Sequence, residues 1–433
     1  MTASQRTHHV ALVRDDTVLV AGDGSLPSFV QDPENDDAPD PTAYATTVAG
    51  HGVHLAPVVT LPAEAPDSRP DRLHVLALRG DAPAGADWRR LDDLAEPWRS
   101  PVRAALEQYA GSAPPRRPDW FRPGWHDRVE AWVDEQLAAN GTRRTGPLRT
   151  HRVWSISAVF EVPTDRGPLW FKACCDHFIA EAAIVGRLAQ RIGHLVPLLV
   201  AGDDRAGWLL MEPLHGASDR DRADGAVDAA APAWARAQVT ALDWLDELRA
   251  AGCPERGLEA TLATWRVVLD TSPELAVLTE AEREQLTTAA AGAEALVREF
   301  WACGIPDTLS HGDLHPGNVA YDGREVRIFD WTDGCVTHPF LDGSHLARVL
   351  DWYGTGAGEA ERVMQAYAAP WRDAFPDADV DRALELAPLA DLVFQTVTFA
   401  QIAAASEDGA GDFDGVVLRF TREVVERVTT AGG

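Results

Sequence analysis

The sequence predicts an α+β protein whose first half is rich in strands and whose second half is helical. Short apolar runs separated by turn residues recur up to about residue 214, as expected for strands. From about residue 230 onward, apolar residues recur at helical spacing instead. A chain of 433 residues is too long for one ordinary hydrophobic core, so we expect two or three domains.

The composition argues against several classes of protein. A formal net charge of −28 leaves little room for the basic face of a nucleic-acid-binding protein, whereas it would suit a cationic small molecule. No apolar run approaches the roughly 18 residues of a membrane span. Residues 1–6 lack the apolar core of a signal peptide. The five cysteines form no C-x-x-C pair, which indicates a reduced, cytoplasmic chain rather than a disulfide scaffold or a zinc site.

Residues 1–112 are expected to form a small accessory α/β domain. Two apolar runs flank Asp15-Asp16, and this pattern predicts a hairpin. Further strands are expected within 51–61 and 73–78, followed by a helix over 101–109.

Residues 113–145 are predicted to form a linker and a helix. The run at 113–118 is rich in proline, as linkers between domains often are. A helix is expected over 126–139, because apolar residues recur on one face of it. Gly141 is its expected C-terminal stop.

Residues 149–173 are predicted to form a meander of three strands. The turn 155–158 joins the first two strands, and Lys172 lies on the third. Lys172 is the only lysine among the 39 lysine and arginine residues of the chain. An ammonium is a compact charge and a guanidinium a broad fork, so a site that needs the compact ion would explain the lysine. A helix follows, with Glu181 in its first turn.

The remainder of the chain is predicted to be helical after two more strands. These strands are expected at 196–200 and 208–212. Helices are expected near 232–250, 257–270, 279–302, 344–369, 380–405 and 414–429.

The most informative stretch is Ser310–Asn318, which reads S-H-G-D-L-H-P-G-N. Asp313 and Asn318 have the spacing H-x-D-x₄-N of a kinase catalytic loop, in which the Asp accepts the proton of a substrate hydroxyl. Asp322-Gly323 then separates two short apolar runs and predicts a hairpin. The hairpin would bring Asn318 close to Asp330, and an amide oxygen with a carboxylate suits Mg²⁺.

These residues resemble the aminoglycoside phosphotransferase family, which includes choline-kinase-like small-molecule kinases. The resemblance covers residues 149 to about 400. It implies a protein-kinase-like bilobal fold, with a β-rich N-lobe at 146–214 and a helical C-lobe at 215–433. It also implies ATP- and Mg²⁺-dependent phosphorylation of a hydroxyl on a small polar molecule, such as an aminoglycoside or an amino sugar. Residues 1–112 resemble a Nudix-type domain that lacks the catalytic Nudix box.

The same resemblance implies roles for individual residues. Asp313 would be the catalytic base, Asn318 and Asp330 the magnesium ligands, and Asp342 a support of the loop from behind. Lys172, paired with Glu181, would order the nucleotide phosphates. Further nucleotide contacts are expected from Ser155, Ser157, Met211, Glu212 and Leu214, and acceptor contacts from Trp331, Asp333 and Asp391.

Three other functions remain open at this point. A metal-dependent phosphoesterase could use the alternating residues His311, Asp313 and His315 as ligands. A non-catalytic ATP-binding module would leave the biological role to the N-terminal domain. A protein kinase is disfavoured, because protein kinases carry Arg where Gly312 stands and Gly where Thr332 stands.

Overall fold

The computed structural model describes residues 6–31, 44, 52–61, 71–79, 86–215, 225–352, 358–407 and 413–431. The chain divides into two units. The first comprises residues 1–176 and 405–412, and the second comprises residues 177–404 and 413–433. The division therefore falls inside 146–214, the range that the sequence analysis assigned to one lobe.

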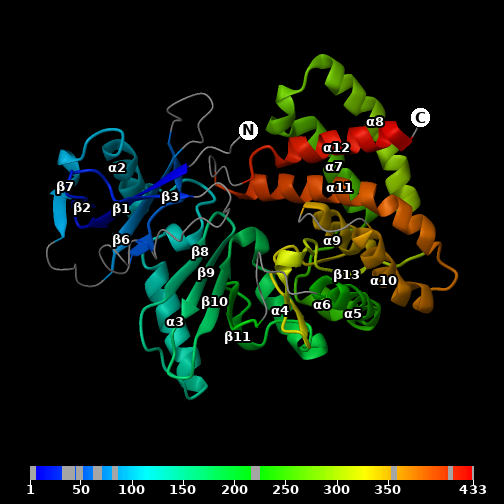
Figure 1. Cartoon of the computed structure of the whole chain (residues 1–433), viewed down its shortest axis with the longest axis horizontal. Helices are drawn as coiled ribbons and strands as arrows, with labels where there is room; N and C mark the ends of the chain where they lie inside the picture. The colour runs from blue at the N-terminus through cyan, green and yellow to red at the C-terminus, as the bar shows by residue number, and fades with distance from the viewer. Residues whose placement is uncertain are drawn as a thin grey trace. The chain divides into compact units, whose positions relative to one another are not determined.

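The first unit begins with a mixed sheet in the strand order β4-β6-β1-β2-β7 (Figure 1). Its elements are β1 (Arg6–Arg14), β2 (Thr17–Val20), β3 (Ser28–Gln31), β4 (Gly52–His54), β5 (Val59–Thr60), β6 (Arg72–Leu78), β7 (Asp87–Arg90) and α2 (Arg99–Glu107). The predicted hairpin is confirmed, because β1 and β2 pair antiparallel around Asp15 and Asp16. Strands β3 and β7 were not predicted from the sequence. Apolar residues of α2, including Val102, pack against one face of the sheet.

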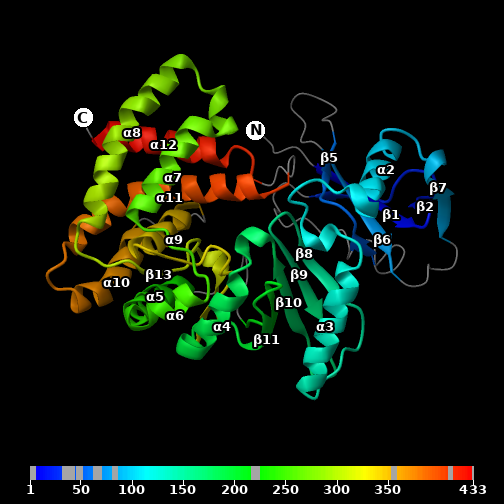
Figure 2. The same ribbon diagram turned by 180° about the vertical axis from the view of Figure 1, so that it is seen from behind.

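The same unit continues with α3 (Trp125–Ala139) and the strands β8 (Arg149–Val153), β9 (Ser157–Val162) and β10 (Leu169–Cys174). The strands form the predicted antiparallel meander, and Lys172 pairs with Val159 on β9. Helix α3 lies along these strands, as both views show (Figures 1 and 2). Trp132 of α3 meets Phe171 of β10 edge to face. Gly141 follows α3 with a φ of +63°, as expected of a helix stop.

A buried ion pair joins Glu407 to the linker within the first unit. Arg117 lies in the linker after the first sheet, and its guanidinium bonds Glu407 through Nη2 at 2.7 Å and also through Nε. The residues are 3% and 8% exposed. Arg117 also donates to Gln108 at the end of the α2 segment. The chain thus returns to the linker after the long helix of the second unit.

The second unit contains two short hairpins, one further strand pair and the remaining helices. Its elements are α4 (Glu181–Ile192), β11 (Leu199–Asp203), β12 (Trp208–Met211), α5 (Ala226–Ala241), α6 (Leu245–Ala250), α7 (Leu258–Thr271), α8 (Glu280–Trp301), β13 (Thr308–Ser310), β14 (Val319–Tyr321), β15 (Val326–Ile328), β16 (Cys335–Thr337), α9 (Phe340–Trp352), α10 (Glu359–Ala374), α11 (Val380–Ala405) and α12 (Val416–Ala431). The predicted helices at 257–270, 279–302, 380–405 and 414–429 are confirmed to within two residues. The predicted helix at 232–250 is two helices, α5 and α6.

Helix α10 packs on α5 and α9, and α8 packs on α7 and α12 (Figures 1 and 2). Helix α8 begins with a capping box between Thr279 and Glu282. Helix α11 is long and apolar enough to cross a membrane by length and composition alone. Its apolar window is 72% buried inside the protein, so α11 serves as a core helix.

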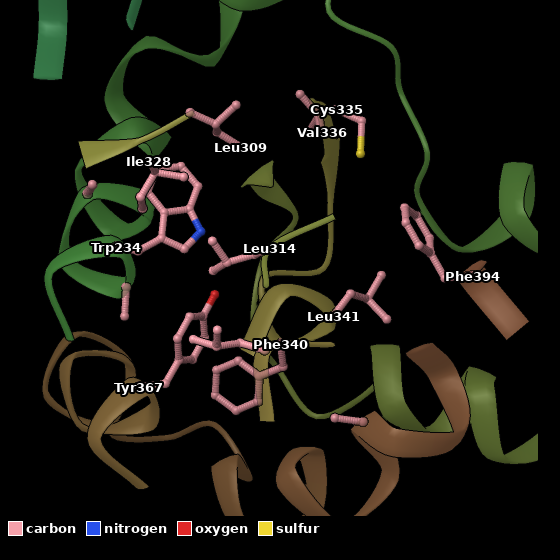
Figure 3. Close-up of a cluster of buried hydrophobic side chains, with 14 of the residues drawn as sticks. Trp234, Leu309, Leu314, Ile328, Cys335, Val336, Phe340, Leu341, Tyr367 and Phe394 are labelled. Carbon is pink, nitrogen blue, oxygen red and sulfur yellow. The ribbon is translucent and has the colours of Figure 1, made fainter. Parts of the chain in front are cut away.

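The core of the second unit encloses the loop after β13. Leu314 lies in a cluster with Trp234, Phe340 and Tyr367 (Figure 3). Leu314 is fully buried, whereas its neighbour Asp313 is not. Burial of Leu314 therefore anchors the loop, while the preceding residue, Asp313, reaches solvent.

Candidate active site

The loop from β13 to β14 makes a close turn at Gly312. This glycine has a φ of +81°, and a Cβ atom built there would lie 2.3 Å from the carbonyl oxygen of Asp333. Any side chain would therefore clash with the backbone and strain the turn. This approach explains why the chain has Gly at the position where protein kinases carry Arg.

Asp342 holds the backbone of this loop from behind, as the resemblance implied. Its carboxylate accepts hydrogen bonds from the amides of His311 at 2.7 Å and Gly312 at 2.9 Å. The indole of Trp234 and the amide of Gln238 donate to the same carboxylate at 2.8 and 3.1 Å. Burial raises the pKa of Asp342, and the electrostatic interaction with His311 and the hydrogen bonds from His311, Trp234 and Gly312 oppose that rise. The carboxylate therefore has a structural role at the site.

His311 also fixes the loop rather than binding a metal. Its imidazole is fully buried, contacts the ring of Trp331, and bonds the carbonyl of Phe329 through Nε2 at 2.9 Å. His315 accepts a hydrogen bond from Gly317 at Nδ1. In the part of the chain that the structure describes, no group of three His, Cys, Asp or Glu residues is arranged to hold a metal. The structure therefore does not support the phosphoesterase set of His311, Asp313 and His315.

Asp313 presents its carboxylate between two histidines. Its side chain is 35% exposed, with Oδ1 lying 3.0 Å from Nε2 of His345 and Oδ2 lying 3.7 Å from Nε2 of His315. Its carbonyl accepts a hydrogen bond from the Asn318 amide at 2.9 Å. Burial would raise the pKa of Asp313, but the bond from His345 and the charges of the nearby histidines outweigh it and lower the pKa. The carboxylate is thus ionised and accessible, as a general base requires.

His345 connects this carboxylate to a buried ion pair. Its Nδ1 lies 3.4 Å from Oδ1 of Asp391, whose Oδ2 accepts a hydrogen bond from Nε of Arg348 at 2.7 Å. Burial would lower the pKa of His345, but Asp391 and Asp313 raise it to about 9. The positions of His345 and Arg348 at the site were not predicted from the sequence. They follow Asp342 at intervals of three residues, a helical spacing that could have placed all three on one face of α9.

The predicted hairpin brings the two expected magnesium ligands to one end of a ribbon. Strands β14 and β15 pair antiparallel, and the amide of Phe329 donates to the carbonyl of Asn318 at 3.0 Å. Asp330 follows with a φ of +65°, a conformation that is rare outside glycine and common at functional sites. Thr332 donates to its Oδ1 at 3.2 Å.

The donor atoms at this end fit Mg²⁺. Because the NH₂ group of Asn318 bonds the carbonyl of Asp313, its amide oxygen remains to act as a ligand. Asp330 adds a carboxylate. Mg²⁺ takes few protein oxygens and keeps water or phosphate for its other positions, so two such residues are sufficient.

Glu181 fixes the backbone beside Asp330. It is the first residue of α4, is 3% exposed, and accepts a hydrogen bond from the amide of Trp331 at 2.8 Å. Its predicted pairing with Lys172 stays a prediction. Trp331 itself is 1% exposed, donates from its indole to the carbonyl of Ile328, and packs on Trp234. A core residue of this kind does not line an acceptor pocket, so the structure corrects that prediction.

The predicted acceptor contact of Asp391 is also corrected, whereas that of Asp333 stays a prediction. Asp391 is fully buried and engaged by Arg348 and His345, so it supports the site without facing an acceptor. Asp333 is half-buried beside the catalytic loop. Burial and the nearby charge of Asp313 raise the pKa of Asp333 to about 7. Asp333 therefore remains a candidate for contact with the acceptor.

The expected nucleotide residues of the first unit lie on the meander. Lys172 is 7% exposed on β10, and Ser155 and Ser157 are 4% and 6% exposed at the turn between β8 and β9. The hydroxyl of Ser157 accepts a hydrogen bond from the indole of Trp154 at 2.7 Å, so only its own hydrogen remains for a phosphate.

The expected hinge residues follow the strand β12 in the second unit. Met211 is half-buried at the end of β12, and Leu214 is half-buried after it. The exposed Glu212 donates its backbone amide to the carbonyl of Leu198. Their contact with adenine stays a prediction.

Residues 169–380 match the profile of the phosphotransferase enzyme family. The chain contains a phosphotransferase-family domain. The matched range includes Lys172, Glu181, Asp313, Asn318 and Asp330, so the family match and the site described above coincide. The Nudix resemblance of residues 1–112 lies outside it and stays a prediction.

Several solved structures are similar to this chain at low sequence identity. One is the GDP complex of aminoglycoside 2'-phosphotransferase-IIIa, with 14% identity, coverage of 71% of this chain and 100% of that chain, and a TM-score of 0.49. Choline kinase LicA from Streptococcus pneumoniae has 13% identity, coverage of 70% and 99%, and a TM-score of 0.48. Macrolide 2'-phosphotransferase MphH from Brachybacterium faecium has 16% identity, coverage of 69% and 97%, and a TM-score of 0.45. Among curated proteins, no match was found.

Proposed function

We propose that the chain is a kinase that transfers the terminal phosphoryl group of ATP to a hydroxyl of a small polar molecule. The observation that carries the proposal is the arrangement of Asp313. Its carboxylate is ionised and partly exposed, while the loop around it is fixed by hydrogen bonds from Asn318 and Gln395 and to Asp342. The family match supports a phosphotransferase. Phosphoryl transfer depends mainly on positioning and charge neutralisation, so a rigid carboxylate of this kind is well suited to it.

In the proposed reaction, Asp313 orients the acceptor hydroxyl and takes its proton. The hydroxyl oxygen forms a bond to the γ-phosphorus, the bond from that phosphorus to the bridging oxygen breaks, and ADP leaves with the electron pair. Oδ2 is the better placed oxygen for this role, because Oδ1 is bonded by His345 whereas His315 is 3.7 Å from Oδ2. That separation is beyond a normal hydrogen bond.

The remaining groups bind the nucleotide in this proposal. Asn318 and Asp330 would hold Mg²⁺, which supplies charge neutralisation at the phosphates when bound. Lys172 would contact the α- and β-phosphates. Backbone and side chains at Ser155, Ser157, Met211, Glu212 and Leu214 would contact the rest of the nucleotide.

The acceptor would be a cationic small molecule, such as an aminoglycoside or another amino sugar. Asp330 and Asp333 both lie within 3.3 Å of the hydroxyl of Thr332. The backbone of Asp333 packs against Gly312, the residue before Asp313. A concentration of carboxylates attracts ammonium groups. The net charge of −28 favours the same class of acceptor. Reduced cysteines would suit a cytoplasmic enzyme.

The test is an ADP-release assay across sugars, amino sugars, amino alcohols, aminoglycosides and macrolides, with ATP and GTP as alternative donors. We expect turnover with one acceptor class and a loss of roughly 10²- to 10⁴-fold in Asp313→Asn, the usual contribution of a general base. Asp322→Asn is the matched control, because Asp322 is a carboxylate in the exposed turn of the adjacent hairpin. Equal rates in wild type and Asp313→Asn would refute the assignment.

The non-catalytic alternative predicts a different result in the same experiment. A nucleotide-binding module would bind ATP in calorimetry and release no ADP with any acceptor. The proposed kinase instead requires release that depends on both acceptor and Asp313.

A further inference from the structure

Helix α9 directs an imidazole at the proposed catalytic base. His345 is 5% exposed, and its Nε2 lies 3.0 Å from Oδ1 of Asp313. We propose that His345 is a positioning residue, whose Nε2–H fixes Oδ1 so that Oδ2 faces the acceptor hydroxyl in one orientation. This inference rests on the proposed function, because it assigns Asp313 the task of receiving a proton.

The surroundings of Nδ1 determine where the ring carries its hydrogen. Nδ1 lies 2.9 Å from Nη2 of Arg348 and 3.4 Å from Oδ1 of Asp391. A guanidinium can only donate, and an ionised carboxylate can only accept. A neutral ring would accept from Arg348 at Nδ1, and a protonated ring would donate to Asp391. In both cases Nε2 carries a hydrogen, and that hydrogen points at Asp313.

The other tautomer is unfavourable for a simple electrostatic reason. It would turn the lone pair of Nε2 toward the lone pairs of a carboxylate oxygen 3.0 Å away. His345 is therefore a donor to Asp313 in every favourable state of the ring.

The ion pair behind His345 restricts the movement of its ring. Asp391 on α11 is fully buried and bonds Nε of Arg348 at 2.7 Å. If His345 turned away, a buried carboxylate would lose one of its partners, which is costly. His315 is a weaker candidate for this role, because its side chain is 27% exposed and its Nε2 is 3.7 Å from Oδ2.

The consequence for catalysis is specific to turnover. His345 bonds the base and has no proposed contact with nucleotide or acceptor. Its loss should misplace the carboxylate without changing the binding of either substrate. A displacement of about 1 Å in a reacting group can cost roughly 10²-fold in rate.

The kinetic test compares three variants with wild type, using the acceptor found in the ADP-release assay. His345→Leu should lower kcat by roughly 10- to 100-fold and leave both KM values within about threefold. His345→Gln keeps an N–H near the Nε2 position and should recover most of kcat. His338→Leu is the matched control, because it removes another buried imidazole of the same unit that packs on Phe300. It should lower the melting temperature and leave kcat unchanged.

A second measurement tests the contact without any turnover. In ¹⁵N spectra of the histidine rings, Asp313→Asn should shift the Nε2 signal of His345 and leave that of His338 in place. An unmoved His345 signal, or a wild-type kcat in His345→Leu, would overturn the inference. Absence of acceptor-dependent turnover in the wild type would instead refute the proposed function, and the spectra would still decide whether His345 bonds Asp313.

Discussion

The two units contain buried histidines in opposite electrostatic environments. In the first sheet, His8, His54 and His74 are each 4% exposed and neighbour one another. Nδ1 of His8 lies 2.9 Å from Nε2 of His74, and the rings of His54 and His74 meet edge to face at 5.9 Å. Burial lowers the pKa of His54 to about 4 and that of His74 well below its usual value. The imidazoles of His54 and His74 are therefore neutral at physiological pH.

The second unit buries His345 to a similar extent with the opposite result. His345 is 5% exposed, but it lies between the carboxylates of Asp313 and Asp391, and its pKa is raised to about 9. Burial is nearly equal in the two regions, so the partners decide the charge. Burial among other histidines favours the neutral imidazole, whereas carboxylates on both sides of a buried imidazole favour its protonated form.

Removal of the buried Asp391 carboxylate should have the largest effect on stability, because it changes the surroundings that distinguish His345 from the histidines of the first sheet. Asp391→Ala leaves the guanidinium of Arg348 and the ring of His345 without their shared acceptor. Removing one partner of a buried ion pair typically costs about 3–5 kcal/mol. We therefore expect the second unit to lose that much stability in urea denaturation. Asp391→Asn, which keeps the shape, should lose less. A loss below about 1 kcal/mol for Asp391→Ala would contradict the assignment.

Acid should affect the first sheet through His54. Its pKa is about 4 in the folded chain against an ordinary value of 6.5, so the unfolded chain binds its proton first as pH falls. The contribution of neutral His54 to the free energy of unfolding is complete above pH 6.5 and is lost toward pH 4, by about 3 kcal/mol at most.

Hydrogen exchange in β4 and β6, measured between pH 7 and 4 and corrected for intrinsic rates, would detect this loss. His54→Leu should remove part of the pH dependence, because His74 still titrates. A pH-independent protection in the wild type would show that the buried histidines of the sheet do not control its stability.

Lys172 sharpens the comparison because it is a buried basic group in the first unit. Lys172→Arg keeps the charge and widens the group, so a nucleotide site that requires a compact ammonium should lose roughly 10²-fold in kcat/KM for ATP. Thermal melts of the variant should match those of the wild type. Activity within about threefold of wild type would mean that the lysine is not required at this position.

An exposed ion pair gives the smallest expected effect. Arg90 pairs with Asp16 at 3.1 Å, with side chains that are 64% and 62% exposed. Exposed pairs contribute at most about 1 kcal/mol, and salt weakens them. Arg90→Ala should therefore destabilise the first unit by no more than that amount, and less in 1 M salt. A loss as large as that of Asp391→Ala would remove the distinction between buried and exposed pairs.

The sequence predicted those parts of the site that depend on local spacing. Asp313 and Asn318 lie within one loop, and a hairpin of adjacent strands carries Asp330 back to it. The turn residues specify such a hairpin directly. The Lys172 strand was predicted for the same reason, since its meander is also local.

The parts that were missed depend on packing between distant helices. The contact of His345 with Asp391 joins α9 to α11, and no local pattern specifies it. The predicted start of α9 at residue 344 also left Asp342 outside the helix, so the sequence did not indicate that Asp342 and His345 share a face. Trp331 was misassigned because a tryptophan beside a catalytic loop has the same sequence signature in a pocket as in a core.

The single lysine gives the chain a chemical handle. Lys172 carries its only side-chain amine, and the residue is 7% exposed on β10. A reagent that acylates amines therefore has one side-chain target, next to the proposed nucleotide. The rate at which the peptide that contains Lys172 gains mass, followed with and without ATP, would report occupancy of the site from a single atom.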